Sequence, residues 1–301
     1  MKSTKKTTAA AAAGVENVPD EFVAYVAGRI SETVKQIATK YRWGMTTCLE
    51  RATGLKSYGK TQKHSNRNDF PGKFMESLKE LCDQVAKAEK EEQKAKAKNR
   101  RAKTNEAVPS FRCEAVLRLR KAFSEAWPCG TSPLEVKQRT AMAKFIVWEW
   151  GRIQSVREEV LEELAKAPAV CEGDQLKQIA SRSKVLASID PENHFIYDSR
   201  VSKALNAYWT GFCGSKPSPF PLLQGRYDAE KASSDKVPVR KAVVSVPFLY
   251  EETYCAFVKA VADELASRHG FNNEGIGELR QKVEMALFTL KDSAGKEGCH
   301  E

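Results

Sequence analysis

Residues 176–205 read "LKQIASRSKVLASIDPENHFIYDSRVSKAL", and this stretch decides the predicted fold. Its first part has apolar residues at helical spacing, which the small polar residues "ASRS" (180–183) interrupt. The helical spacing resumes at Val185 and continues until Asp190 and Pro191 end it, since proline cannot continue a helix. The stretch therefore predicts a helix, a tight turn at 180–183 and a second helix.

A turn of small residues that opens a helix leaves backbone N–H groups exposed, and such groups favour a phosphate. The whole chain carries a formal net charge of +10, so a partner rich in phosphate is expected. We therefore predict that this turn binds a phosphate group. The predicted phosphate contacts, which are DNA contacts where the partner is DNA, are Ser181, Arg182, Ser183, Lys184 and, at the start of the following helix, Arg200.

A single carboxylate, Asp198, follows the apolar residues 195–197 and stands directly before the next helical pattern. The simplest interpretation is a helix cap, because an aspartate in this position accepts hydrogen bonds from the first N–H groups. The alternative is that Asp198 is the working group of an enzyme. A helix amino-terminus favours the anion by roughly 0.3–1 kcal/mol, and Arg200 adds positive charge nearby, so a cap and a catalyst would occupy the same position.

Helical periodicity dominates the rest of the chain. Apolar residues step by three and four along 23–37, a second helix begins near Pro71, and two closing helices follow along 254–265 and 276–290. The segment "FIVWEW" (145–150) is apolar on nearly all sides, so we expect a central, buried helix there. The predicted fold class is all-α.

The composition along the chain predicts a disordered tail (1–20), an amino-terminal helical region ending in a basic linker (21–105), and a main helical domain (106–301). Residues 87–103 carry eight basic side chains against three acidic ones. Such a charge run is typical of a solvated helix end or a linker. The alternative is a basic arm that adds non-specific affinity for nucleic acid.

Cysteine and histidine usage argues against a metal centre. The eight cysteines never form a C-x-x-C pair and the four histidines do not cluster, so neither a metal site nor a disulfide framework is predicted. No apolar run approaches the roughly 20 residues that span a bilayer, and the amino-terminus lacks a secretory signal. We expect a reduced, cytoplasmic, nucleoid-associated monomer without a cofactor or a membrane partner.

Four motifs occur in the order found in a known family. The strongest is "IYDSRVSKAL" (196–205), which is preceded by "RSKVL" (182–186) and followed by "FPLLQGR" (220–226) and "EMALF" (284–288). Over about residues 110–292 the chain thereby resembles the helix-hairpin-helix DNA glycosylases, in particular the bacterial branch described as 8-oxoguanine DNA glycosylase-like. The resemblance implies a helix-hairpin-helix bundle, here with an added amino-terminal helical region.

The resemblance also implies an enzyme that hydrolyses the N-glycosidic bond of a modified base flipped out of double-stranded DNA, with Asp198 as its catalytic carboxylate. Bifunctional members use in addition a lysine that forms a Schiff base. The nearest candidate here is Lys184, but it lies one place before the family's register, about 100° of helix away. Ser181 and Ser183 stand where the family has hairpin glycines. We therefore predict a monofunctional enzyme that uses water.

A flipped base needs a pocket, and aromatic side chains are expected to line it. For each candidate aromatic the alternative is a place in the hydrophobic core, and for Glu149 it is a place on the surface. The predicted base-pocket residues are Trp148, Glu149, Trp150, Tyr197, Tyr208 and Trp209.

Two other functions stay open at this point. One is a non-catalytic DNA-binding protein with the same hairpin fold, and the other is a helical interaction protein whose basicity is incidental. For the enzyme, the same sugar chemistry would serve oxidised guanine, alkylated bases or hypermodified pyrimidines of phage genomes. The biological setting is accordingly either DNA repair or defence against phage.

Overall fold

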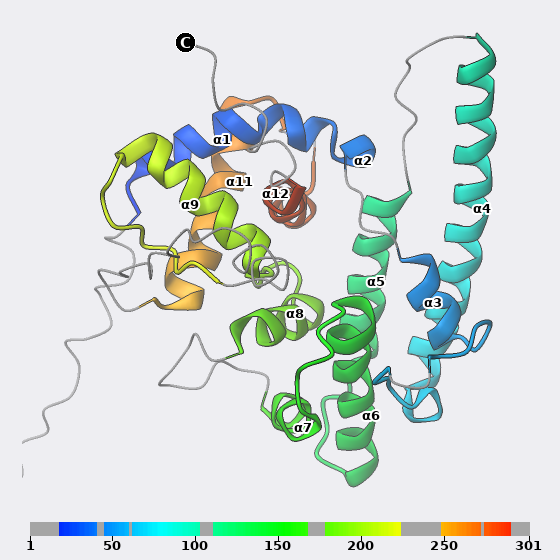
Figure 1. The fold of residues 1–301 in the computed structure, drawn as a ribbon. Helices are drawn as coiled ribbons and strands as arrows, with labels where there is room; N and C mark the ends of the chain where they lie inside the picture. The colour runs from blue at the N-terminus through cyan, green and yellow to red at the C-terminus, as the bar shows by residue number, and fades with distance from the viewer. Residues whose placement is uncertain are drawn as a thin grey trace, which may run out of the picture.

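The computed structural model describes residues 18–40, 45–59, 62–102, 111–167, 178–223, 248–271 and 274–289. All regular elements within these ranges are helical, which confirms the all-α class (Figure 1). The predicted tail up to residue 17 lies outside them. The helices are α1 (Asp20–Lys35), α2 (Ile37–Lys40), α3 (Thr46–Ala52), η2 (Arg67–Asp69), α4 (Gly72–Ala102), α5 (Arg112–Ala126), α6 (Pro133–Lys144), η3 (Phe145–Trp150), α7 (Glu158–Lys166), α8 (Ile179–Ile189), α9 (Ser199–Cys213), η4 (Tyr250–Cys255), α11 (Ala256–Arg268) and α12 (Ile276–Thr289).

The amino-terminal helices share one hydrophobic core with the rest of the molecule. The buried face of α1 packs against α11 and α12. The ring centre of Phe22 in α1 lies 5.0 Å from that of Trp209 in α9 and 5.6 Å from that of Phe257 in α11. The same buried cluster extends to Leu287 in α12. The boundary predicted near residue 105 therefore does not separate two independent cores.

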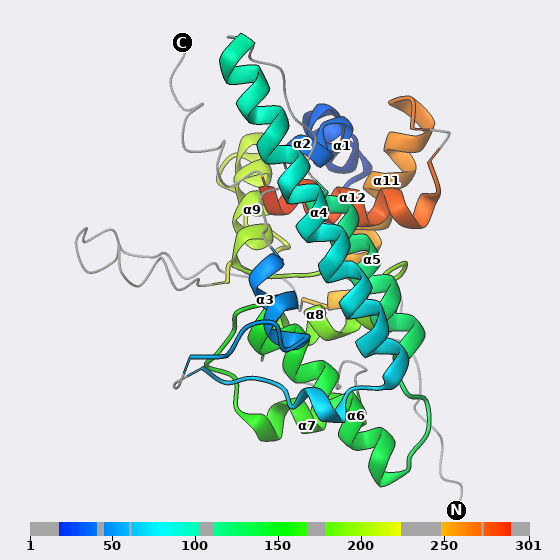
Figure 2. The same cartoon turned by 90° about the vertical axis from the view of Figure 1, so that its right-hand side faces the viewer.

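Helix α4 is 31 residues long and has two unlike halves. Its first half buries Phe74, Leu78 and Val85 and packs against α5. Beyond Val85 the only buried side chain of α4 is Glu92, and the helix runs on past the end of α5 (Figures 1 and 2). Residues 87–102 therefore form a solvated helical extension, which is the helix-end interpretation of this charge run rather than the linker.

The expected central helix is formed by α6 and by η3, a π-helical turn that continues it. All six residues of η3 are buried, as predicted. The turn ends where the N–H of Gly151 donates to the carbonyl of Ile146 over 2.8 Å. A π turn inserts an extra residue into a helix and recurs at functional sites. Here it carries the chain to Gly151, beside α8.

The turn predicted at 180–183 is wrong, because these residues lie inside the continuous helix α8. The chain turns earlier, at Gln178, which has a left-handed φ of 60°. Residues 168–177, where the first helix of the hairpin was expected to begin, lie outside the described residues. Ser181 and Ser183 are 2% and 0% exposed, so their small size allows close packing of the helix. A run of small polar residues is typical of a turn, but it also suits a helix that packs closely against its neighbours, as it does here.

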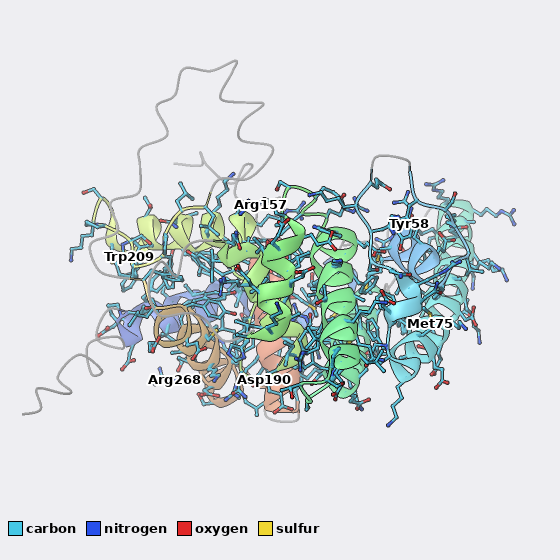
Figure 3. All side chains as sticks on the ribbon, turned by 90° about the horizontal axis from the view of Figure 1, so that it is seen from below. Tyr58, Met75, Arg157, Asp190, Trp209 and Arg268 are labelled. Carbon is cyan, nitrogen blue, oxygen red and sulfur yellow. The ribbon has the colours of Figure 1, made fainter. Side chains whose placement is uncertain are left out.

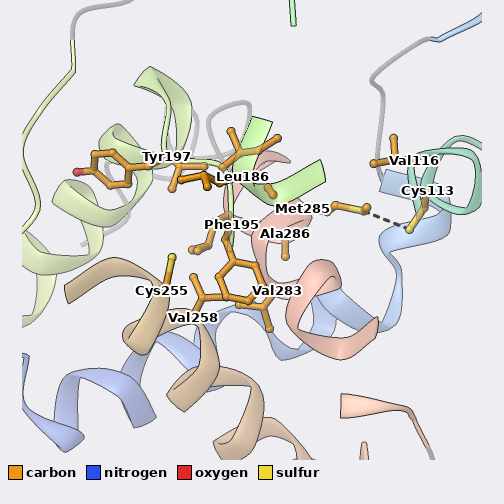
Figure 4. Close-up of a cluster of buried hydrophobic side chains, with 14 of the residues drawn as sticks. Cys113, Val116, Leu186, Phe195, Tyr197, Cys255, Val258, Val283, Met285 and Ala286 are labelled. Carbon is orange, nitrogen blue, oxygen red and sulfur yellow. Dashed lines mark hydrogen bonds between the residues drawn. The ribbon is translucent and has the colours of Figure 1, made fainter. Parts of the chain in front are cut away.

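An extended segment, residues 194–198, follows α8 and is held by side chains from several elements. The N–H of Tyr197 donates to the hydroxyl of Ser183 (3.0 Å), and the N–H of Ile196 donates to the carboxylate of Glu284 in α12 (3.0 Å). The hydroxyl of Tyr254 donates to the carbonyl of Ile196 (2.9 Å). Figure 4 shows Phe195 and Tyr197 among buried side chains from α8, α11 and α12. These bonds fix the segment that ends at Asp198.

Candidate active site

Asp198 is the N-cap of α9, and its two carboxylate oxygens have different partners. One oxygen, Oδ1, accepts from the N–H groups of Arg200 (2.9 Å) and Val201 (3.3 Å). The cap interpretation of the sequence is thereby confirmed. The other oxygen, Oδ2, lies 3.2 Å from Nζ of Lys184, and the Asp198 side chain is 16% exposed. Capping thus occupies one oxygen and leaves the other facing an amine.

Lys184 brings a buried amine to this carboxylate. Its side chain is 6% exposed, and its stem passes Gly151 so closely that a Cβ at Gly151 would lie 2.8 Å from the Cδ of Lys184. The expectation that its register points Lys184 away from the site is wrong. That register was counted from a turn at 180–183, whereas α8 begins at Ile179 and turns Ser183 and Lys184 toward Tyr197 and Asp198 respectively.

A small cavity of about 30 Å³ lies at this ion pair. This volume holds about two water molecules, since one water needs about 10–15 Å³. A nucleobase would therefore enter only after part of the wall moves. Phe288 is a partly buried wall residue, and the guanidinium of Arg200 lies 4.6 Å from its ring centre. The lining residues are Trp150, Gly151, Lys184, Ile196, Asp198, Glu284, Met285 and Phe288.

Three of these lining residues, Glu284, Met285 and Phe288, stand in the motif "EMALF" but were not assigned a role from the sequence, and Glu284 and Phe288 bear on the site. Glu284 is 3% exposed and accepts from Arg120 (2.6 Å) with one oxygen and from the N–H of Ile196 with the other. It therefore positions the segment that carries Asp198. Phe288 contributes an aromatic ring to the wall of the cavity. The motif itself was the available signal for both residues, but it gives no orientation.

The tyrosines beneath the segment are hydrogen-bond donors that stay neutral. Burial raises the pKa of Tyr254 well above its ordinary value, and nearby Glu284 raises it further. Burial likewise raises the pKa of Tyr250, whose hydroxyl donates to the carbonyl of Phe195 (2.5 Å). Neither phenol ionises at neutral pH, so both continue to satisfy buried carbonyls of residues 195 and 196.

Among the six predicted base-pocket residues, Trp150 lines the cavity at Asp198. It is 4% exposed, and its Nε1–H is buried without an acceptor among the described residues. A buried donor without a partner costs about 1–3 kcal/mol, which a ligand acceptor would offset. Trp150 is therefore the predicted aromatic whose position fits contact with a bound group.

The other five lie elsewhere. Tyr197 is fully buried and donates to the carbonyl of Pro221 (2.6 Å), and Trp209 donates from Nε1 to the carbonyl of Lys216 (3.1 Å). Tyr208 is partly buried beside Tyr25 of α1. These three belong to the core, which was the alternative weighed for each. Trp148 and Glu149 line a separate cleft on the other side of Gly151.

The predicted DNA contacts also divide into two groups. Ser181 and Ser183 are buried inside α8, so neither can offer its backbone N–H to a phosphate, and this part of the prediction is wrong. Lys184 is buried against Asp198 and is not a surface contact in this structure. Arg182 and Arg200 are partly exposed, so both remain candidates for DNA contact.

Comparison with protein-family models, with curated proteins and with solved structures gives no match for this chain. The resemblance of its motifs to the helix-hairpin-helix glycosylases therefore stays a prediction. In the part of the chain that the structure describes, no helix combines the length and the apolar character that crossing a membrane requires.

Proposed function

We propose that this protein is a DNA glycosylase that releases a modified base flipped out of double-stranded DNA. The observation that carries the proposal is the second oxygen of Asp198, which takes no part in capping and pairs with Lys184 at a small cavity that Trp150 also lines. The net charge of +10 supports a partner rich in phosphate.

Hydrolysis of an N-glycosidic bond requires a carboxylate held beside the sugar. Breaking the N-glycosidic bond builds oxocarbenium character on the sugar, as in glycoside hydrolysis. A fixed carboxylate beside C1′ stabilises this cation, and it can orient or deprotonate an attacking water. Asp198 meets the requirement of fixity, because its other oxygen is tied to the first turn of α9.

Entry of the base requires the cavity to enlarge. Flipping a nucleotide costs roughly a few kcal/mol of stacking and pairing, so the pocket must return a comparable amount. Contacts with Trp150 and Phe288, including an acceptor for the Nε1–H of Trp150, are the interactions that we assign to this purpose.

The position of Lys184 favours a second candidate, a glycosylase that also cleaves the strand. In that reaction the neutral amine attacks C1′, and the C1′–N bond breaks with its electron pair leaving on the base. The C1′–O4′ bond then breaks as O4′ gains a proton and the amine nitrogen loses one, which forms the Schiff base. Loss of a proton from C2′ then expels the 3′ phosphate and cuts the strand. The amine must first lose a proton, and Oδ2 of Asp198 at 3.2 Å is positioned to accept it. The register that led the sequence analysis to favour water is wrong, so both routes remain in the proposal.

The test is base release from a panel of DNAs that contain modified bases, phage DNA among them. We expect Asp198→Asn to lower release by at least about a hundredfold, within the range typical of a lost acid–base group. Asp263→Asn, which changes an exposed carboxylate in α11, is the matched control. If Asp198→Asn fails to fold, Asp198→Asn combined with Lys184→Gln removes the buried charge pair together. If Asp198→Asn releases the base within a few-fold of the parent rate, Asp198 is only a helix cap and the proposal is wrong.

A further inference from the structure

A second and larger cleft is lined by residues that flank Trp150 and Gly151 in the chain, the two residues of this segment that line the cavity at Asp198. Its volume is about 350 Å³, and the amino-terminal region supplies one of its walls through α3 and the residues that follow. The other wall is the end of η3 and the residues after it. The charged and aromatic lining residues are Arg51, Tyr58, Lys63, Trp148, Glu149 and Arg152.

Both oxygens of the carboxylate in this cleft, Glu149, already accept hydrogen bonds from the protein. One oxygen of Glu149 accepts from the N–H of Ser65 (2.8 Å) and from its hydroxyl, and the other accepts from the hydroxyl of Tyr58. Burial raises the pKa of Glu149 above its ordinary value. Glu149 therefore holds Tyr58 and Ser65 against η3, which gives this predicted base-reading residue a role that needs no base.

The remaining titratable groups leave the cleft cationic. Three cations, Arg51, Lys63 and Arg152, face the single carboxylate. Burial raises the pKa of the Cys48 thiol to about 12, and burial raises that of Tyr58 as well, so neither adds negative charge at neutral pH.

Arg51 and Lys63 both line this cleft, and each has donor capacity that no acceptor among the described residues uses. The Nε–H of Arg51 is buried and has no acceptor among the described residues. Nζ of Lys63 donates to the carbonyl of Val156 (3.0 Å), which uses one of the three protons of an ammonium group. Because three cations and a single carboxylate line the cleft, an anion bound there would be stabilised by charge-assisted hydrogen bonds.

The aromatic rings of the cleft are not available for stacking with a base. The ring of Tyr58 stacks on His64 with centres 4.2 Å apart, and the guanidinium of Arg51 lies 6.0 Å from its centre. The ring of Trp148 has the ammonium groups of two lysines at 5.5 and 5.7 Å. The chemistry of the cleft therefore fits a phosphate group and not a nucleobase.

The backbone joins this cleft to the catalytic cavity. Gly151 touches the stem of Lys184 in the cavity, and the next residue, Arg152, lines the cleft. Arg152 has a φ of 54°, a left-handed conformation that costs a non-glycine residue about 1–3 kcal/mol and recurs at ligand-binding sites. The cavity and the cleft are therefore lined by consecutive residues of one segment.

The cleft also lies on the same side of the molecule as α9, the helix that Asp198 caps. Figures 2 and 3 both show the chain that follows α3 on the same side as α9, whose first turn is capped by Asp198. In Figure 3, Tyr58 and Arg157 are at the edge where α9 lies.

We propose that this cleft binds a backbone phosphate of the DNA strand beside the flipped nucleotide, so that the amino-terminal region is part of the DNA-binding surface. The inference rests on the proposed function only in taking DNA as the partner. It assigns a role in substrate binding to residues 45–65, which no motif of the sequence explains.

The experiment measures equilibrium binding to a short duplex with a central tetrahydrofuran abasic-site analogue, over a range of salt concentrations. Arg51→Ala with Lys63→Ala should weaken binding at least several-fold and reduce the slope of log K against log salt by about 0.9, the value for one phosphate contact. Lys121→Ala with Arg268→Ala removes the same charge from side chains that are 75% and 71% exposed elsewhere, and its slope should match the parent. Equal slopes for both double variants would overturn the inference.

A methylphosphonate scan of the same duplex locates the phosphate. In the parent, neutralising one or two phosphates next to the abasic analogue should weaken binding, and in Arg51→Ala with Lys63→Ala the same substitutions should cost nothing further. The same positional profile in both proteins would contradict the inference. Arg51→Lys keeps the charge and should retain the parental slope, which separates charge loss from misfolding.

Two further outcomes are distinguishable. If inorganic phosphate raises the melting temperature of the parent but not of the double variant, while their DNA binding is the same, the cleft takes free phosphate and the DNA assignment fails. If Asp198→Asn releases base like the parent while the cleft variant still loses DNA affinity, the glycosylase proposal fails and the phosphate site stands.

Discussion

Replacing Gly151 by alanine would place a methyl group between the carbonyl of Ile146 and the stem of Lys184. The new Cβ would lie 2.8 Å from that carbonyl oxygen, 2.8 Å from Cδ of Lys184 and 3.1 Å from its Cε. Contacts under 3.0 Å require movement, so the backbone around Ile146, in the buried π-helical turn η3, must shift, and so must the more flexible lysine stem. Its displacement lengthens the 3.2 Å distance between Nζ and Asp198.

The Gly151→Ala substitution has two opposite effects on the free energy of unfolding, one from the new contacts and one from the conformational preference of the backbone. Gly151 has a φ of −76° and a ψ of −14°, which alanine adopts readily. Backbone entropy alone would therefore stabilise the alanine variant by about 0.4–1 kcal/mol. Overpacking costs about 1–3 kcal/mol, so the free energy of unfolding should fall by roughly 1–2 kcal/mol net. We expect base release to fall by more than about tenfold, because 1.4 kcal/mol lost from the transition state is a factor of ten.

The assays are urea denaturation and single-turnover base release. Gly28→Ala is the matched control, because a Cβ there meets nothing within 4 Å and the residue lies inside α1. This variant should be more stable than the parent by about 0.5–1 kcal/mol and equally active. A Gly151→Ala protein that unfolds and reacts like the parent would refute the close packing of Lys184 on Gly151 and the assignment of the amine to the site.

Three other predictions follow from single contacts. Borohydride should trap a covalent adduct between the protein and substrate DNA if the lyase route operates, and Lys184→Ala should abolish the adduct; persistence of the adduct in that variant would exclude Lys184 as the nucleophile. Glu284→Gln should lower base release more than DNA affinity, since the carboxylate supports the segment of Asp198 through Ile196; a loss confined to DNA affinity would contradict this role. The free energy of unfolding of the parent, relative to Glu149→Gln, should fall as pH rises from about 4.5 through the raised pKa of Glu149, because the folded state holds the Glu149 proton more tightly than the unfolded state. Urea denaturation at several pH values measures this free energy, and a rise with pH would refute the raised pKa.

Features that depend on local order could be predicted from the sequence. Apolar spacing of three and four residues places α1, α9 and α12 correctly, because the helical repeat is a property of neighbouring residues. The cap at Asp198 is equally local, since its acceptor oxygen reaches N–H groups only two and three residues ahead. The burial of η3 follows from its having an apolar residue on nearly every side.

The tertiary structure alone decided which side chains meet. "ASRS" has the composition of a turn, yet its serines pack inside α8, because a small side chain serves a tight helix contact as well as a loop. Lys184 reaches Asp198 across 14 residues, and Glu149 holds Ser65 across 84. Of the aromatics in η3, only Trp150 came to the cavity, and no local rule distinguishes it from Trp148. Such pairings are set by the burial of surfaces distant in sequence, and periodicity carries no information about which of those surfaces come together.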